Sequence, residues 1–213
     1  MSWLVDAVPS SERARVESVL GSCSVLSLLG GSSLGADRFD SVSMLLIEEG
    51  LVLISASDRE SARRIVVSLT GPGSVVLPPG ADERLEALAD ARVTLISASS
   101  NRRLLEIPAA AISIIDGIGA GLQDCRQSLA HFASHRHAER VRLKLIQLAR
   151  SYGKVGTDGL LLEVPLTHEL LADMVGSTRE TVTRALAHLA HEGIIQRERG
   201  RYRVRIPPEA LGP

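Results

Sequence analysis

Four polar residues within one short stretch have the types and spacing needed to read a DNA sequence: Arg179, Glu180, Thr183 and Arg184. A guanidinium can donate two hydrogen bonds to guanine, and a carboxylate can accept one from the amino group of cytosine. Apolar residues recur between these polar residues at helical spacing, so we expect the four to share the outer face of a helix. The buried face of that helix would consist of Val182, Ala185, Leu186 and Leu189.

Two helices and the turn between them would position these side chains. The first helix should begin at Thr167, whose hydroxyl can cap it, and should end at Gly176. Its apolar residues have helical spacing and would face the core: Leu170, Leu171, Met174 and Val175. Ser177, followed three residues later by Glu180, matches a capping box and predicts the start of the second helix. Two helices joined by a tight turn, with the second helix entering the major groove, form a helix-turn-helix.

A basic hairpin is expected after the second helix. Gly193 should end that helix, a strand should begin at Ile194 and Ile195, and a second strand should run from Tyr202 to Ile206. The turn between the two strands reads Arg-Glu-Arg-Gly-Arg over residues 197–201. An ordinary helical hairpin with solvated charges is the alternative. The coincidence of caps, turn, outward arginines and basic hairpin favours a winged helix that binds DNA.

The second helix resembles the recognition helix of the Crp/Fnr family, the bacterial transcription factors that include the cyclic-AMP receptor protein and the fumarate-nitrate regulator. The family's Arg-Glu-Thr-Val-x-Arg core is matched by residues 179–184. This resemblance implies that Arg179, Glu180 and Arg184 read bases and that Thr181 contacts phosphate. Together with the helix starts and the wing, the expected phosphate contacts are Thr167, His168, Ser177, Thr181, Arg199 and Arg201.

The resemblance implies an α+β fold with three parts. Residues 1–107 would form an antiparallel β jelly roll like a cyclic-nucleotide-binding domain, 108–136 a connector with a long dimerisation helix, and 137–213 the winged helix-turn-helix. Short apolar runs separated by Gly, Ser, Asp and Pro favour many antiparallel strands in the first part. These runs are Val25–Leu29, Val42–Ile47, Leu51–Ile54, Ile65–Leu69, Val75–Leu77 and Val93–Ile96.

A short capped helix is expected at Ser10–Leu20, and further helices at Pro108–Ile115 and His137–Tyr152. The buried face of the last helix would consist of Val141, Leu145, Leu148 and Ala149. Residues 116–121 are glycine-rich, and each Gly costs about 1 kcal/mol relative to Ala in a helix. We therefore expect a break there and a new helix from about Ala120 to Ser134. Residues 154–159 should form a loop before a strand over Leu160–Val164.

Five apolar residues in the helix near residue 125 step by 4, 3, 4 and 3 positions, as in a coiled-coil seam: Ile118, Leu122, Cys125, Leu129 and Phe132. Packing of this seam on the chain's own barrel is the alternative. The resemblance implies pairing with the same helix of a second copy. Such a homodimer would hold two recognition helices about 34 Å apart, which suits an inverted repeat in DNA.

The barrel departs from the cyclic-AMP binders of the family, which hold the phosphate with a Gly-Glu pair and a later Arg-Ser or Arg-Thr pair. The loop over residues 73–80 contains no Gly-Glu, and Ala81 and Asp82 stand where Arg-Ser belongs. Arg84 could be displaced into that role, but the acidic Asp82, Glu83 and Glu86 would repel a phosphate. We expect no cyclic AMP binding, so the barrel senses an unknown effector or none.

Charge is distributed unevenly, although the formal net charge of the 213 residues is only −1. Residues 137–206 hold 12 Arg and Lys against 8 Asp and Glu, whereas residues 1–136 hold 12 against 16. The basic half therefore contains the DNA motif, as neutralisation of phosphates requires. No signal peptide precedes the first acidic residues and no apolar run approaches about 20 residues, so we expect a cytoplasmic protein with no membrane contact.

Other chemistries find less support in the sequence. Cys23 and Cys125 are too few for an iron-sulfur cluster, and no nucleophile, base and metal ligands converge as in an enzyme. His131, His135 and His137 lack a further ligand, so no metal or other cofactor is expected. Cys125 could form an interchain disulfide, and the arginines of residues 59–64 could hold an acidic ligand such as cyclic di-GMP, although a solvated turn is preferred.

The expected partners are double-stranded DNA and a second copy of the chain, with RNA polymerase as a further candidate. A ligand-binding or scaffold protein that uses its winged helix for protein contacts is the rival hypothesis. Weak DNA affinity that is insensitive to sequence would favour that rival.

Overall fold

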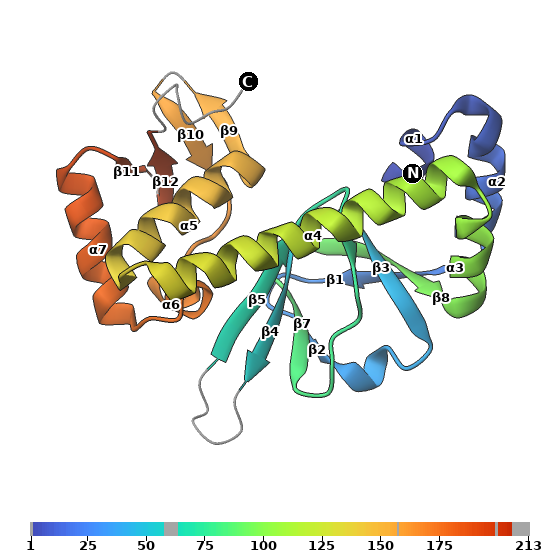
Figure 1. The fold of residues 1–213 in the computed structure, drawn as a ribbon, viewed down its shortest axis with the longest axis horizontal. Helices are drawn as coiled ribbons and strands as arrows, with labels where there is room; N and C mark the ends of the chain where they lie inside the picture. The colour runs from blue at the N-terminus through green and yellow to red at the C-terminus, as the bar shows by residue number, and fades with distance from the viewer. Residues whose placement is uncertain (1, 58–63, 157, 199, 206–213) are drawn as a thin grey trace. The chain divides into compact units, whose positions relative to one another are not determined.

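The computed structural model describes residues 2–57, 64–156, 158–198 and 200–205 (Figure 1). The chain divides into two units, Met1–Arg126 and Gln127–Pro213. Three predictions fall at least partly outside the described residues. They concern the phosphate contact of Arg199, the end of a strand at Ile206, and residues 59–63 of the arginine-rich segment.

The first unit contains two four-stranded antiparallel sheets. One has the order β1 (Ser24–Leu28), β8 (Ala91–Ser97), β3 (Val42–Glu49) and β6 (Val75–Val76). The other has the order β2 (Ser33–Gly35), β7 (Glu83–Ala87), β4 (Val52–Ser57) and β5 (Arg64–Thr70), and a 3-10 helix, Ala36–Arg38, follows β2. The predicted α+β fold with an antiparallel barrel is confirmed. The short strands β2 and β7 were not predicted, because they lack an apolar run.

Strand β3 is buried on both faces, and this position explains its uninterrupted apolar sequence. Leu45 and Ile47 point into the core between the two sheets, where they pack with residues such as Leu85 and Val93. Met44 and Leu46 alternate with them and belong to a second core under the helices. Successive side chains of a strand point to opposite faces, so one continuous apolar run supplies both cores.

The start of α4 (Pro108–Ser134) and three shorter helices cover the second core: α1 (Trp3–Asp6), α2 (Ser10–Leu20) and α3 (Ala98–Leu105). The helix predicted over Ser10–Leu20 is confirmed, but its predicted cap is wrong, because Pro9 precedes it and no side chain caps it. Helix α3 was not predicted. Its start is capped by Ser97, and only Ser100 and Leu104 are buried, which is too short a pattern to detect in the sequence.

Helix α4 runs without a break from Pro108 to Ser134, so the break predicted at residues 116–121 is wrong. A Cβ on Gly117 would lie 2.8 Å from Cγ2 of Val75 on β6. The glycine therefore allows a close approach between helix and sheet, which buries Ala110 and Ile114 against the second core. Burial of one aliphatic side chain stabilises by about 1.5–3 kcal/mol, which exceeds the cost of one glycine.

The second unit contains the end of α4, three further helices and one sheet. The helices are α5 (His137–Tyr152), α6 (His168–Val175) and α7 (Arg179–His191). The sheet has the order β11 (Ile195–Glu198), β12 (Arg201–Val204), β10 (Gly159–Leu162) and β9 (Gly153–Gly156). Helix α5 and its four predicted inward residues are confirmed. Strand β9 corrects the loop predicted from residue 154, because its backbone pairs with β10.

Across the part of the chain that the structure describes, no single helix is long and apolar enough to cross a membrane. The pair formed by α3 and α4 reaches that length and apolarity only together, with a bend of 115° between them.

Candidate DNA interface

Helix α6 begins and ends as its sequence predicts. The hydroxyl of Thr167 accepts a hydrogen bond from the amide of Leu170 at 3.0 Å, which satisfies one of the free N–H groups at the start of the helix. Gly176 ends α6 with a positive φ of 59°, a conformation that glycine adopts without the steric cost of a Cβ. The predicted inward residues of α6 are buried.

The start of α7 differs from the prediction, because Thr178 and not Ser177 caps the helix. The Thr178 hydroxyl accepts from the amide of Thr181 at 3.3 Å. The amide of Ser177 instead donates to the carbonyl of Ala172 at 3.0 Å, which completes the C-terminal cap of α6. Ser177 Oγ is buried and has no hydrogen-bond partner among the described residues, so it cannot reach a DNA phosphate without a change of rotamer.

Helix α7 has one buried face and one exposed polar face. The predicted buried residues Val182, Ala185, Leu186 and Leu189 are confirmed. Arg179, Glu180 and Arg184 are exposed, and Arg184 Nη2 lies 3.4 Å from the Thr181 hydroxyl. Hydrogen bonds from its own backbone amide and from Thr178, together with the two arginines, lower the pKa of Glu180. Glu180 is therefore ionised and can accept a hydrogen bond from a base.

The wing is a hairpin in which Arg197 of β11 pairs in register with Tyr202 of β12. Arg201 Nη1 lies 3.4 Å from Glu163, and the ammonium group of Lys154 lies 2.6 Å from the same carboxylate. The hydrogen bond from Lys154, followed by the charges of Lys154 and Arg201, lowers the pKa of Glu163. The side chain of Arg201 is exposed, and Glu163 neutralises only part of its charge. Its guanidinium can therefore still donate a hydrogen bond to a phosphate.

A groove of about 660 Å³ lies between α6, the start of α7 and the wing. Its lining comprises Pro165, Leu166, Thr167, His168, Glu169, Arg179, Arg197 and Gly200. Arg197 was not among the residues predicted to contact DNA, although it belongs to the basic run of the wing. The Arg197 guanidinium and the Thr167 hydroxyl along this groove can bind a phosphodiester backbone, and Arg179 lines the groove from α7.

The turn between α6 and α7 is packed against the end of α4. A Cβ on Gly176 would collide with the ring of Phe132, and the Arg140 guanidinium lies 4.3 Å from the centre of that ring. Phe132 thus contacts the helix-turn-helix itself, a contact that the prediction of a seam position did not include.

Gly176→Ala should destabilise the DNA-binding unit by about 1–3 kcal/mol, because alanine disfavours the left-handed conformation and its Cβ displaces the Phe132 ring. The measurement is the free energy of unfolding in urea. Gly119→Ala is the matched control: this helical glycine has open space around its Cβ position, so the change should stabilise by about 0.4–1 kcal/mol. Equal effects of the two changes would contradict the role assigned to Gly176.

Comparison with known proteins agrees with this geometry. A family model described as the Crp-like helix-turn-helix domain matches residues 139–211. The global nitrogen regulator of Synechocystis sp. is 28% identical over 131 residues, which cover 60% of this chain and 58% of that protein. The transcriptional regulator SdrP of Thermus thermophilus is 29% identical over 153 residues, which cover 70% of this chain and 72% of that protein.

Residues 139–211 are a Crp-like helix-turn-helix domain. A solved structure of a CooA mutant from Carboxydothermus hydrogenoformans shares the fold, with a TM-score of 0.77 and 19% identity over 91% of this chain and 88% of that one. The match to the Synechocystis protein spans less than two thirds of that protein's length.

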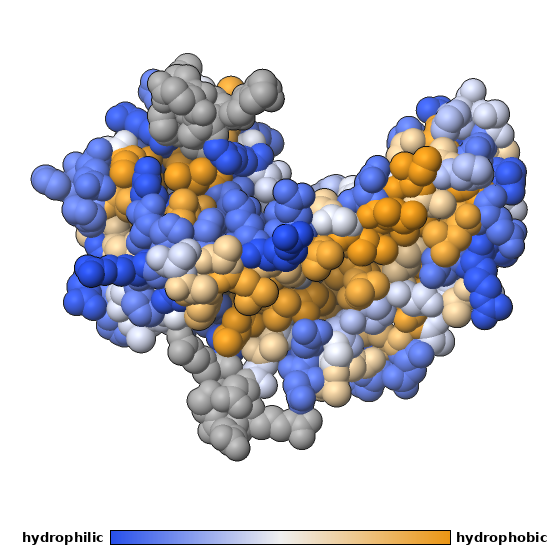
Figure 2. All heavy atoms as spheres, in the orientation of Figure 1, coloured by the Kyte–Doolittle hydropathy of each residue, from blue (hydrophilic) through white to orange (hydrophobic). Residues whose placement is uncertain are grey.

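The predicted seam lies on an exposed apolar stripe of α4, which Figure 2 shows as an orange band. Leu122 and Leu129 are 60% and 70% exposed. The stripe extends beyond the predicted residues to Ile112 and Ile115. Cys125 is less exposed than its neighbours, and its Sγ lies 4.0 Å from the carbonyl of Val67 on β5.

In the barrel, the loop before β7 has an amide that is satisfied from within. The amide of Gly80 donates to the Glu83 carboxylate at 2.8 Å, and residues 77–82 form no helix. Arg84 donates to the hydroxyl of Ser33 at 2.7 Å and to its carbonyl at 3.2 Å. The one guanidinium considered for a phosphate is thus bound to β2.

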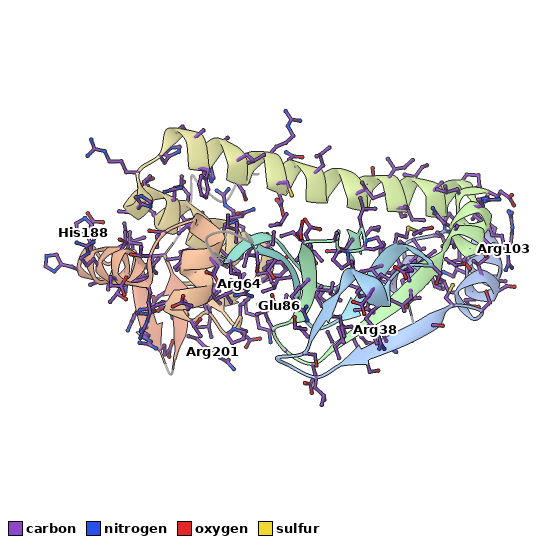
Figure 3. All side chains as sticks on the ribbon, turned by 90° about the horizontal axis from the view of Figure 1, so that it is seen from below. Arg38, Arg64, Glu86, Arg103, His188 and Arg201 are labelled. Carbon is purple, nitrogen blue, oxygen red and sulfur yellow. The ribbon has the colours of Figure 1, made fainter. Side chains whose placement is uncertain are left out.

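A second polar cluster lies on strands β4, β5 and β7, where Arg64 and Glu86 point toward each other (Figure 3). Arg64 Nη2 lies 2.8 Å from Glu86, and the buried Ser55 hydroxyl donates to the same carboxylate. Glu86 therefore holds Arg64 within the sheet. Arg64 is thus the first residue of a strand and is ion-paired, so the prediction of a solvated turn is wrong for this residue.

The histidines near the end of α4 do not assemble a metal site. The rings of His131 and His135 pack edge to face with centroids 5.6 Å apart. Among the described residues, no group of three or more His, Cys, Asp or Glu side chains could hold a metal ion. Burial, followed by the charge of His135, lowers the pKa of His131.

Proposed function

We propose that this chain is a sequence-specific DNA-binding regulator of the Crp/Fnr family in which α7 enters the major groove. The observation that carries the proposal is the division of α7 into a buried apolar face and an exposed face with Arg179, Glu180 and Arg184. These three side chains read bases, and the groove beside them binds the phosphodiester backbone. Thr167, Thr181, Arg197, Arg201 and the wing residue Arg199 contact phosphates.

The regulator acts as a homodimer on an inverted repeat, with α4 as the dimerisation helix. The exposed apolar stripe of α4 supports this assembly, since monomeric proteins rarely leave such a continuous apolar surface in water. Residues 1–107 serve as the sensor-like barrel, 108–136 as the connector and 137–213 as the DNA-binding domain. Because the proposed regulator acts by binding DNA, we expect it to be located in the cytoplasm.

The test is selection of bound sequences from a randomised duplex library by the purified, ligand-free protein at fixed salt. Recovery of an inverted repeat is the expected result and establishes a dimeric reader that needs no effector. Retention of duplexes without any shared sequence would support the rival scaffold function instead.

The barrel of this regulator does not bind cyclic AMP. The Glu83 carboxylate already accepts the hydrogen bond from the amide of Gly80. A second anion at this loop would be repelled by the negative charges of Asp82 and Glu83. Millimolar cyclic AMP should therefore leave the thermal unfolding midpoint unchanged, whereas a ligand at 100 times its Kd stabilises by about 2.7 kcal/mol. A rise of several degrees, or heat of binding in calorimetry, would show that the barrel does hold the nucleotide.

A further inference from the structure

The imidazole of His168 connects three elements of the DNA-binding unit. Its Nδ1 lies 2.8 Å from the hydroxyl of Thr183 on α7, and its Nε2 lies 3.1 Å from the hydroxyl of Tyr202 on β12. His168 itself opens α6. Both ring nitrogens are therefore occupied by the recognition helix on one side and by the wing on the other.

The hydrogen-bond network selects one tautomer of the neutral ring. The Thr183 hydroxyl donates its single proton to the carbonyl of Arg179 at 2.9 Å, so it can only accept from His168. The ring proton of a neutral His168 therefore resides on Nδ1, and Nε2 accepts the proton of the Tyr202 hydroxyl. The chain of donors runs from the wing through His168 to the first turn of α7.

The surroundings keep His168 neutral. Arg179 faces it from α7 and Arg197 from β11, Glu169 follows it on α6, and Tyr202 lies opposite on β12. Burial, then the charges of Arg197 and Arg179, lower the pKa of His168 below the ordinary value of an imidazole. Burial raises the pKa of Tyr202, against the opposing charge of Arg197, so the phenol keeps its proton.

We propose that His168 is a positioning residue that fixes the wing relative to the recognition helix through its neutral imidazole, and that it does not contact a DNA phosphate. This inference rests on the proposed function, in which α7 and the wing bind the same DNA site. It replaces the phosphate contact predicted from the sequence, because the groove contains no free nitrogen of this ring.

The direction of the pH dependence distinguishes the two roles. A proton on Nε2 reverses the hydrogen bond with Tyr202 and places an imidazolium beside Arg179 and Arg197, whose charges oppose it. A positioning role therefore predicts weaker binding to the selected site as the pH falls through the lowered pKa of His168. A phosphate contact predicts the opposite, since an imidazolium strengthens binding to every sequence and steepens the salt dependence by about 0.9 in the log-log slope.

The experiment compares affinities between about pH 8 and pH 5 for the full-length protein and its His168→Gln variant. Glutamine does not titrate, so the loss of affinity on acidification should be present in the wild type and absent in this variant. His191→Gln is the matched control, because His191 is exposed at the other end of α7. It should keep the wild-type pH profile. Binding that strengthens on acidification in the wild type alone would overturn the proposal, as would identical profiles for wild type and His168→Gln.

Single-atom changes test the network at constant pH. Tyr202→Phe removes the hydroxyl and keeps the buried ring, and Thr183→Val removes the hydroxyl of α7. Each should weaken binding to the selected site about two- to tenfold, the effect of one neutral hydrogen bond, whereas Thr183→Ser should restore wild-type affinity. Wild-type affinity in Tyr202→Phe would overturn the proposal.

Failure of this inference differs from failure of the proposed function. If only the role of His168 is wrong, the protein still selects an inverted repeat, and Arg179→Ala still weakens that binding. If the proposed function is wrong, no sequence is selected at any pH.

Discussion

Replacement of Leu122 and Leu129 by glutamate is expected to convert the protein to a monomer and to lower its affinity for the full inverted repeat about 10²- to 10⁴-fold. The reason is the loss of the second binding event, which occurs within one complex when two recognition helices are joined. Full burial of one leucine side chain stabilises by about 1.5–3 kcal/mol, so a dimer that buries this seam is stabilised by that amount for each leucine it buries. A carboxylate at the same position must instead lose its hydration.

The measurements are the molar mass in solution and the affinity for the full repeat and for a half-site. Both leucines are largely exposed in the protomer, so the variant should keep its helical circular dichroism. Leu105→Glu is the matched control, because Leu105 is a 46% exposed leucine on α3 and lies outside the stripe. A double variant that stays dimeric and binds the full repeat as the wild type does would refute the assignment of α4.

Arg179→Ala is expected to lower affinity for the selected site by about 1–3 kcal/mol and to abolish the preference at one base pair. Arg179 is the first residue of α7 and lines the groove beside Thr167 and Arg197. Its guanidinium has no ion-pair partner among the residues that the structure describes, so it is available for a base edge. The measurement is affinity for the selected site, for its single-base variants and for random DNA.

Arg150→Ala is the matched control, since it removes one exposed arginine near the end of α5 that does not line the groove. It should change affinity little and leave sequence preference intact. Arg199→Ala in the wing should weaken binding on all sequences alike, because a phosphate contact carries no base information. An equal loss on selected and random DNA for Arg179→Ala would show that Arg179 does not read a base.

The helices of the second unit could be predicted from the sequence because their signals are local. The hydroxyl of Thr167 caps a helix within three residues of itself, and Gly176 ends the same helix one residue after its last turn. The apolar residues of α7 repeat within a few turns. Such signals depend on nearby residues alone, so the sequence contains them in full.

Elements that depend on distant partners escaped prediction. Strands β2, β7 and β9 form because a neighbouring strand supplies hydrogen bonds, and their sequences lack an apolar run. The start of α7 was misplaced for a related reason. Ser177 and Thr178 are both residue types that cap helices. Thr178 caps α7, because the amide of Ser177 donates its hydrogen bond to the end of α6.

The sequence by itself therefore determined the α+β fold, the Crp-like helix-turn-helix domain and the polar face of α7, since motif, periodicity and caps are properties of contiguous residues. Only the tertiary structure decided that α4 continues through its glycines, where Gly117 meets Val75. It also decided that His168 meets Thr183 and Tyr202, 15 and 34 residues away. Packing and hydrogen bonds between distant segments can outweigh local propensity by a few kcal/mol, and no window of sequence contains both partners.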